Sequence, residues 1–250
     1  MTALPVRIDA PASERTGIAS RLARQDWQGI EEQLNAFGCA RLPSLLEEPE
    51  CDGLEALYSQ DERFRSRVVM ARHGFGLGEY KYFCYPLPPL VSELREAAYG
   101  HLAPMANRWQ EALRVAVRYP AEHAHFIRRC HEAGQDRPTP LMLRYTKGDY
   151  NCLHQDLYGE HVFPLQVAIL LDRPGLDFTG GEFVMTEQRP RRQSRPEVVP
   201  LDKGDAVVFA VHTRPAAGSR GIYRVNHRHG VSRLRSGSRH TLGVIFHDAQ

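Results

Sequence analysis

The sequence predicts an α+β protein in which a helical amino-terminal layer packs on a carboxy-terminal jelly roll, or double-stranded β-helix. Apolar residues recur at helical spacing over much of residues 17–140, whereas residues 141–250 hold short apolar or alternating runs. Turn-forming segments such as KGDY, LDKGD and RSGS separate these runs, which is typical of an all-β sandwich or barrel. We expect the two parts to form one compact unit, preceded by a disordered polar segment at residues 1–16.

The elements before residue 141 follow from the spacing of apolar side chains and from turn residues. Helical spacing extends from Ile18 to Phe37, where Gly38 is placed to end the helix. The other expected elements are a strand at 39–46, a helix at 48–58, strands at 65–72 and 80–85, a helix at 90–118 that Pro104 could interrupt, and a helix at 121–133. The segment GQDRPTP then breaks the helical pattern.

The elements from residue 141 onward are expected to be short strands. The runs that predict them are LMLRYT (141–146), FPLQVAILL (163–171), GGEFVMT (180–186), DAVVFAV (205–211) and HTLGVIFH (240–247).

Composition narrows the class of protein. The chain has 250 residues, 42% of them hydrophobic and 25% charged, which is ordinary for a globular protein with a sizeable core. A net charge of +2 creates no whole-protein field that favours nucleic acid, although arginines gather in segments 189–195 and 224–239. Five cysteines without CxxC spacing argue against a disulfide scaffold and a cysteine zinc site, and leave any role for these thiols open. The start lacks a signal-peptide pattern and no apolar run has membrane-spanning length, so we expect a cytoplasmic protein without a membrane partner.

The segment His154-Gln155-Asp156 is the first candidate for a metal site. Side chains alternate along a strand, so His154 and Asp156 are expected on the same face. An HxD pair alone is more often a surface pair than a ligand set. A second histidine from a distant strand, His229, could supply a third ligand, and two histidines with one carboxylate are typical of non-haem Fe(II) oxygenases.

The distal histidine has competitors in the same half of the chain. His227 lies on the same face of its strand as His229, so either could face the metal; the other histidines in this half are His212, His240 and His247. We prefer His229 because Arg239 follows it by ten residues. A turn at Ser236-Gly237 would form an antiparallel hairpin that brings Arg239 beside the ligand. His240 would then point the opposite way, as a surface or packing residue.

Arg239 suggests the co-substrate. An arginine inside a barrel is costly unless a carboxylate pairs with it, and a fixed guanidinium suits a dicarboxylate such as 2-oxoglutarate. Thr241 would face the same way and could donate to the same carboxylate. Tyr145, on the strand before His154, is a further candidate partner or, equally, a core tyrosine.

These motifs resemble the Fe(II)/2-oxoglutarate-dependent oxygenases. The segment LRYTKGDYNCLHQD is similar to their first core hairpin, TGGEFVMTE and KGDAVVFAVH to middle strands of prolyl-hydroxylase-like members, and HGVSRLRSGSRHTLGVIFH to the strands with the distal histidine and arginine. The segment FGCARLPSLLEEPECDGLEALY resembles the opening of such domains. The chain is also similar to a bacterial branch often labelled as oxygenases of damaged or alkylated DNA. Unlike AlkB-like repair enzymes, it has Leu143 in place of an asparagine and Ile245 in place of a second arginine.

The resemblance implies a dioxygenase that uses Fe(II), 2-oxoglutarate and O2, with ascorbate as a supporting reductant in assays. His154, Asp156 and His229 would be the catalytic metal ligands, and Arg239 with Thr241 and Tyr145 would bind 2-oxoglutarate. The reaction would hydroxylate or oxidatively demethylate a C–H bond and release succinate and CO2. The sequence leaves the oligomeric state open, and it leaves the substrate open among alkylated nucleic acid, a peptide side chain and a small molecule. A cupin-like metal enzyme without 2-oxoglutarate and a non-catalytic nucleic-acid binding module are the alternatives.

Overall fold

A computed structural model describes residues 17–219 and 221–250, so the disorder predicted for residues 1–16 lies outside the described residues. The helices in this part are α1 (Ile18–Ala23), α2 (Trp27–Phe37), α3 (Glu48–Leu57), α4 (Pro89–Ala112) and α5 (His123–Glu132), with the short turns η1 (Asp61–Arg63) and η2 (Met70–His73). None of the helices described is both long and apolar enough to cross a membrane.

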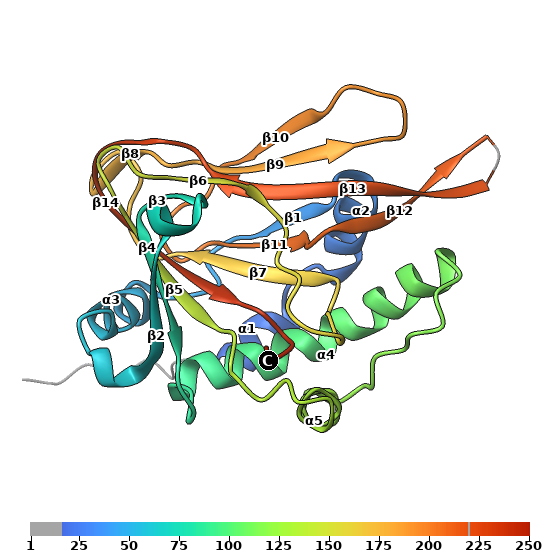
Figure 1. Cartoon of the computed structure of the whole chain (residues 1–250), viewed down its shortest axis with the longest axis horizontal. Helices are drawn as coiled ribbons and strands as arrows, with labels where there is room; N and C mark the ends of the chain where they lie inside the picture. Colours follow the sequence, from blue (N-terminus) through green and yellow to red (C-terminus); the bar gives the residue numbers. More distant parts are fainter. Residues whose placement is uncertain (1–16, 220) are drawn as a thin grey trace, which may run out of the picture.

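The strands form two antiparallel sheets (Figure 1). The larger sheet has the order β1-β11-β7-β14-β5-β4-β2, with β8 beside β14. Its strands are β1 (Cys39–Leu42), β2 (Phe64–Val69), β4 (Glu79–Phe83), β5 (Leu141–Thr146), β7 (Leu165–Leu170), β8 (Phe178–Gly180), β11 (Ala206–Ala210) and β14 (Leu234–Val244). Antiparallel sheets accompanied by a few helices confirm the predicted α+β class.

The smaller sheet has the order β10-β9-β13-β6-β3, with β12 beside β13. Its strands are β3 (Gly76–Leu77), β6 (Tyr150–His154), β9 (Phe183–Gln188), β10 (Arg195–Val199), β12 (Thr213–Gly218) and β13 (Gly221–Val231). In Figure 1 this sheet lies above β7 and β11, while α1 and α4 lie below them.

One core packs the helices on the larger sheet. Leu22 of α1 and Leu94 of α4 belong to the same buried cluster as Val208 of β11 and Val244 of β14. A second cluster lies between the sheets and includes Phe209 of β11 and Met185 of β9. Each side of the larger sheet is therefore covered, which explains the nearly continuous apolar sequence of its central strands.

The single helix predicted from Ile18 to Phe37 is in fact two helices. The Asp26 side chain accepts a hydrogen bond from the main-chain N–H of Gly29 at 3.0 Å. An aspartate in this position caps a new helix, because it satisfies an N–H that has no partner inside the helix. Gly38 ends α2 with a φ of 82°, as predicted, since only glycine adopts this conformation without strain.

Helix α4 runs through Pro104 without interruption and ends before the predicted limit. Pro104 lies on the exposed face of α4, whose opposite face is fixed on the sheet. The helix ends at Ala112 rather than Arg118, because Arg114 adopts a left-handed φ of 56° that cannot continue it. The strand predicted at 39–46 is likewise shorter, since β1 ends at Leu42.

The hairpin predicted around Ser236-Gly237 is wrong. Strand β13 pairs with β6, β9 and β12, whereas β14 pairs with β5, β7 and β8, so the two consecutive strands belong to different sheets. Gly237 instead pairs with Phe178 of β8. A Cβ at this glycine would lie 1.9 Å from the carbonyl oxygen of Asp177. Gly237 thus marks a close approach of two backbones, a role that a sequence cannot distinguish from a turn.

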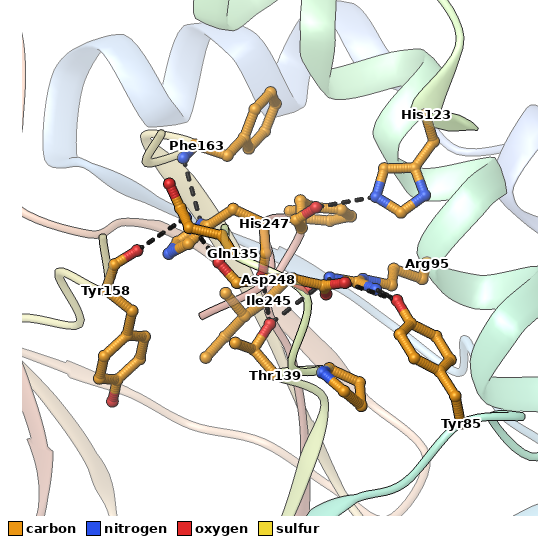
Figure 2. A network of polar contacts seen from close by, with 12 residues as sticks. Tyr85, Arg95, His123, Gln135, Thr139, Tyr158, Phe163, Ile245, His247 and Asp248 are labelled. Atoms are coloured by element: carbon orange, nitrogen blue, oxygen red, sulfur yellow. Dashed lines mark hydrogen bonds and ion pairs between the residues drawn. The ribbon is translucent and has the colours of Figure 1, made fainter. Parts of the chain in front are cut away.

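A buried polar network fixes the last residues of the chain on α4 (Figure 2). Arg95 donates to the Asp248 carboxylate at 2.7 Å and to the carbonyl of Ile245 at 2.8 Å. Gln135 donates to the main-chain carbonyls of Asp248 at 2.6 Å and Tyr158 at 3.1 Å. The network therefore connects the chain end to the segment that follows Asp156.

Candidate functional site

Two histidines and one aspartate converge where β6 lies beside β13. His154 ends β6, His229 is its register partner on β13, and Asp156 follows two residues after His154. Each histidine places Nε2 3.4 Å from a different oxygen of the Asp156 carboxylate. Their ring centroids are 4.3 Å apart. The structure thus brings together the three residues that the sequence singled out as metal ligands, and their ligand atoms are close enough to share one ion.

The charge of this group favours a cation. Burial by itself would raise the pKa of Asp156, but the contacts from His154 and His229 lower it well below its usual value, so the carboxylate stays ionised. His154 Nδ1 lies 2.8 Å from the carbonyl oxygen of Cys152, to which it can only donate. In the neutral ring this hydrogen bond leaves Nε2 with a free lone pair directed at the group.

The Asp156 carboxylate is held by two residues that the sequence analysis missed. Tyr158 donates to Oδ1 at 2.8 Å, and Gln166 donates to Oδ2 at 2.9 Å. Gln166 is buried on β7, inside an otherwise apolar run. That single amide within FPLQVAILL was the available signal, because a polar side chain in a buried strand needs a partner.

Arg239 on β14 is buried, with an exposed fraction of 2%. Its Nη1 donates to Thr241 Oγ1 at 2.5 Å, and its guanidinium lies 5.8 Å from the ring centre of Tyr145, its register partner on β5. Neither Arg239 Nε nor the Tyr145 hydroxyl has a hydrogen-bond partner among the described residues. A buried guanidinium without a carboxylate is costly, so this arrangement fits an anionic ligand.

Both groups face one cavity of about 360 Å³ between the sheets. It is lined by all six predicted site residues, namely Tyr145, His154, Asp156, His229, Arg239 and Thr241. Aromatic and aliphatic side chains form much of the remaining wall, among them Phe75, Tyr80, Tyr82, Leu143 and Phe209. The cavity therefore combines a potential metal group, a cationic anchor and an apolar space.

His227 is not part of this group. Its ring is buried against Gly38, where an added Cβ would lie 2.5 Å from the imidazole, and neither ring nitrogen has a partner among the described residues. Burial lowers the pKa of His227 to about 4, which keeps the ring neutral. Of the two histidines that strand periodicity allowed, the structure brings His229 to Asp156. His240 lies on the other side of β14, beside Asp172.

The donor atoms fit a divalent metal of the iron type. Two imidazole nitrogens and one carboxylate from one side leave further coordination positions for other ligands, as in non-haem Fe(II) sites. The unpartnered polar atoms of Arg239 and Tyr145 supply a separate place for a carboxylate. The five cysteines are free thiols outside both groups.

Several known proteins are similar to this chain. Two mycobacterial relatives, "Uncharacterized protein MT2286" and "Uncharacterized protein Rv2227" of Mycobacterium tuberculosis strains CDC 1551 and H37Rv, are each 47% identical over 167 residues, 67% of this chain and 72% of theirs. Prolyl 4-hydroxylases from Phytophthora capsici share the fold, with a TM-score of 0.52 and 14% identity over 92% of this chain and 65% of theirs.

A family model described as "Oxygenase, catalysing oxidative methylation of damaged DNA" matches residues 78–249. This range contains all six predicted site residues, from Tyr145 to Thr241. This match confirms the resemblance to the bacterial branch of oxygenases. The chain therefore belongs to the Oxygenase-NA family.

Proposed function

We propose that this protein is an Fe(II)/2-oxoglutarate-dependent dioxygenase that hydroxylates or oxidatively demethylates a C–H bond. The observation that carries the proposal is the presence, in one cavity, of a two-histidine, one-carboxylate group and a buried arginine without a carboxylate partner. In an enzyme that uses 2-oxoglutarate, that arginine would have a partner in the distal carboxylate of the co-substrate. The paired antiparallel sheets then correspond to a double-stranded β-helix core with the N-terminal helices as its support.

In this proposal His154, Asp156 and His229 hold the metal, and Tyr158 and Gln166 orient the aspartate. When bound, iron with 2-oxoglutarate and O2 supplies the oxidising chemistry, and the co-substrate leaves as succinate and CO2. Arg239 pairs with the distal carboxylate of 2-oxoglutarate, with Thr241 and Tyr145 as further hydrogen-bond donors. The apolar wall excludes water from the reacting carbon.

The proposed substrate is an alkylated base in DNA, because the family is described as acting on damaged DNA and alkylation is one form of such damage. Oxidation of an N-methyl carbon would release formaldehyde and restore the base. Tyr80 and Tyr82 in the cavity wall could stack on a base that has left its helix. A peptide side chain is the competing substrate. Each candidate is supplied to the enzyme together with ascorbate, and the formaldehyde and succinate formed show which of them is oxidised.

The first test measures anaerobic binding of 2-oxoglutarate to the Fe(II)-loaded protein. The readout is the visible metal-to-ligand absorption band. We expect a band in the wild type, a weaker one in Arg239→Ala and none in His229→Ala. Arg235→Ala is the matched control, because Arg235 lies on the same strand but is exposed.

A well-loaded wild type without a band would overturn the proposal. Metal binding without any response to 2-oxoglutarate would favour a cupin-like enzyme. DNA binding that needs no metal and weakens with salt would favour a non-catalytic binding module.

A further inference from the structure

A second group of metal-ligand side chains lies on the opposite side of β14 from the cavity. It consists of Glu55 on α3, Asp172 after β7 and His240 on β14, with ligand atoms within 4.8 Å of one another. Side chains alternate along a strand, so His240 faces outward while its neighbours Arg239 and Thr241 line the cavity. The group is therefore separate from the proposed iron site.

The two distances from His240 to the carboxylates are close to those between two ligands of one ion. His240 Nδ1 lies 3.2 Å from Asp172 Oδ2 and 3.5 Å from Glu55 Oε1. Two ligands that are each about 2.1 Å from a tetrahedral zinc ion lie about 3.4 Å apart. One ring proton can serve only one of the two carboxylates, whereas one cation at this nitrogen would satisfy both.

The two carboxylates of the group have no direct ion pair with a lysine or an arginine within the described ranges, although the positive charge of Lys203 also acts on Glu55. The Asp172 side chain is 7% exposed. Buried charges are normally paired or bound to metal. Burial, and next the negative charge of Asp172, raise the pKa of Glu55, which reflects the unfavourable proximity of two carboxylates.

The local structure holds the ligands in place and gives an ion access to them. The main-chain N–H of His240 donates to Asp172, which fixes this carboxylate beside the ring. Glu55, the most exposed of the three at 41%, and His240 line a cavity of about 380 Å³ that Tyr58 and Arg144 also line. The cavity can supply water as a fourth ligand.

We propose that Glu55, Asp172 and His240 bind a divalent cation, and that zinc is the ion this donor set fits best. Zinc is bound by imidazole nitrogens and by carboxylate oxygens, and a water can take the fourth position beside three protein ligands. This site does not depend on the oxygenase reaction, because none of its ligands touches the cavity between the sheets.

The test measures zinc binding after the first group has been removed. Calorimetry on metal-free His154→Ala/His229→Ala protein should give one zinc per chain. Adding Glu55→Gln should weaken this binding by more than about tenfold. Adding Glu48→Gln should not, because Glu48 is an exposed residue of the same helix and forms no ion pair with any residue that the structure describes. Co²⁺ in place of zinc should give visible d–d bands that depend on Glu55 and are lost in His240→Gln.

Equal zinc affinity of the Glu55→Gln and Glu48→Gln proteins would overturn the proposal, as would a background protein that binds no zinc. If the double-alanine background does not fold, the wild-type chain serves. There Glu55→Gln should weaken one of the two zinc-binding events by more than about tenfold, and two unchanged zinc affinities would reject the site. Failure of 2-oxoglutarate binding alone would reject the oxygenase proposal and leave this one standing.

Discussion

The Tyr158 hydroxyl donates a 2.8 Å hydrogen bond to the Asp156 carboxylate and itself accepts one from Tyr82 at 3.2 Å. Gln166 donates to the other carboxylate oxygen, so both oxygens of the only aspartate in the candidate metal group are oriented before any metal arrives. A ligand fixed in this way loses less entropy on coordination, which makes its hydrogen-bond donors part of the site.

Tyr158→Phe should therefore weaken Fe(II) binding by about 10–100-fold while the fold is retained. The hydroxyl is the only group lost, so the change should be smaller than that caused by Asp156→Ala. Anaerobic Fe(II) titration gives the affinity, and Tyr150→Phe, at an exposed tyrosine of β6, is the control. Equal iron affinity in Tyr158→Phe and wild type would remove Tyr158 from the site.

Gly38→Ala should destabilise the fold by about 2–4 kcal/mol, because alanine is strained at a φ of 82° and its Cβ would meet the buried His227 ring. Urea unfolding measures the change. Gly100→Ala is the opposite case, since Gly100 is an exposed residue of α4 with open space around it. That substitution should stabilise the protein by about 0.5–1 kcal/mol, and a similar loss at both positions would contradict the argument.

His123 should make the metal-free protein less stable in acid. Burial and then the charge of Arg95 lower its pKa to about 4, while Nε2 lies 2.8 Å from the carbonyl oxygen of Phe246. Above pH 6.5 the ring is neutral in both states and contributes no pH dependence. As the pH falls from 6.5 towards 4, only the unfolded chain takes up the proton, so stability falls, by about 2 kcal/mol at pH 5.

His123→Gln should remove this part of the pH dependence. The measurement is the difference in unfolding free energy between pH 7.5 and pH 5, with His125→Gln, at an exposed position of the same helix, as the control. An unchanged difference in His123→Gln would show that another group is responsible.

Arg95→Met should destabilise the protein by about 3–5 kcal/mol, because it leaves the fully buried Asp248 carboxylate without its guanidinium partner. The double variant Arg95→Met/Asp248→Asn should recover part of this loss, since the buried charge is then gone. A double-mutant cycle of unfolding free energies tests the pair, and additive effects would mean that the two side chains do not interact.

The sequence predicted the central strands well because they are buried on both faces and apolar. Strands β10 and β12 were missed, since RPEVV and TRPAAG each contain proline and few inward apolar residues. The change of sheet between β13 and β14 was also missed. Adjacent strands usually pair, and only the whole arrangement of strands decides that these two do not.

The sequence identified candidate residues for the site, but not how these residues are arranged in space. Two-residue spacing identified His154 with Asp156, but the same rule left His227 and His229 equivalent. The two histidines differ because His227 packs against Gly38, which ends a helix about 190 residues earlier in the sequence. A contact between such distant residues cannot be inferred from local spacing. Arg239 and the two histidines line the same cavity, although the hairpin that was expected to bring them together does not exist. Arg239 reaches the cavity from the opposite sheet.

Because the metal-ligand histidines and Arg239 lie on different sheets, the distance between the sheets limits which 2-oxo dicarboxylic acids can bind both. His154 and His229 lie on the smaller sheet, whereas Arg239, Thr241 and Tyr145 lie on the larger one. Packed sheets keep a nearly fixed separation of about 10 Å. If the co-substrate bridges the two sheets, their separation selects for the length of its carbon chain. Oxaloacetate, one carbon shorter, and 2-oxoadipate, one carbon longer, should each fit worse than 2-oxoglutarate, without any side chain dedicated to rejecting them.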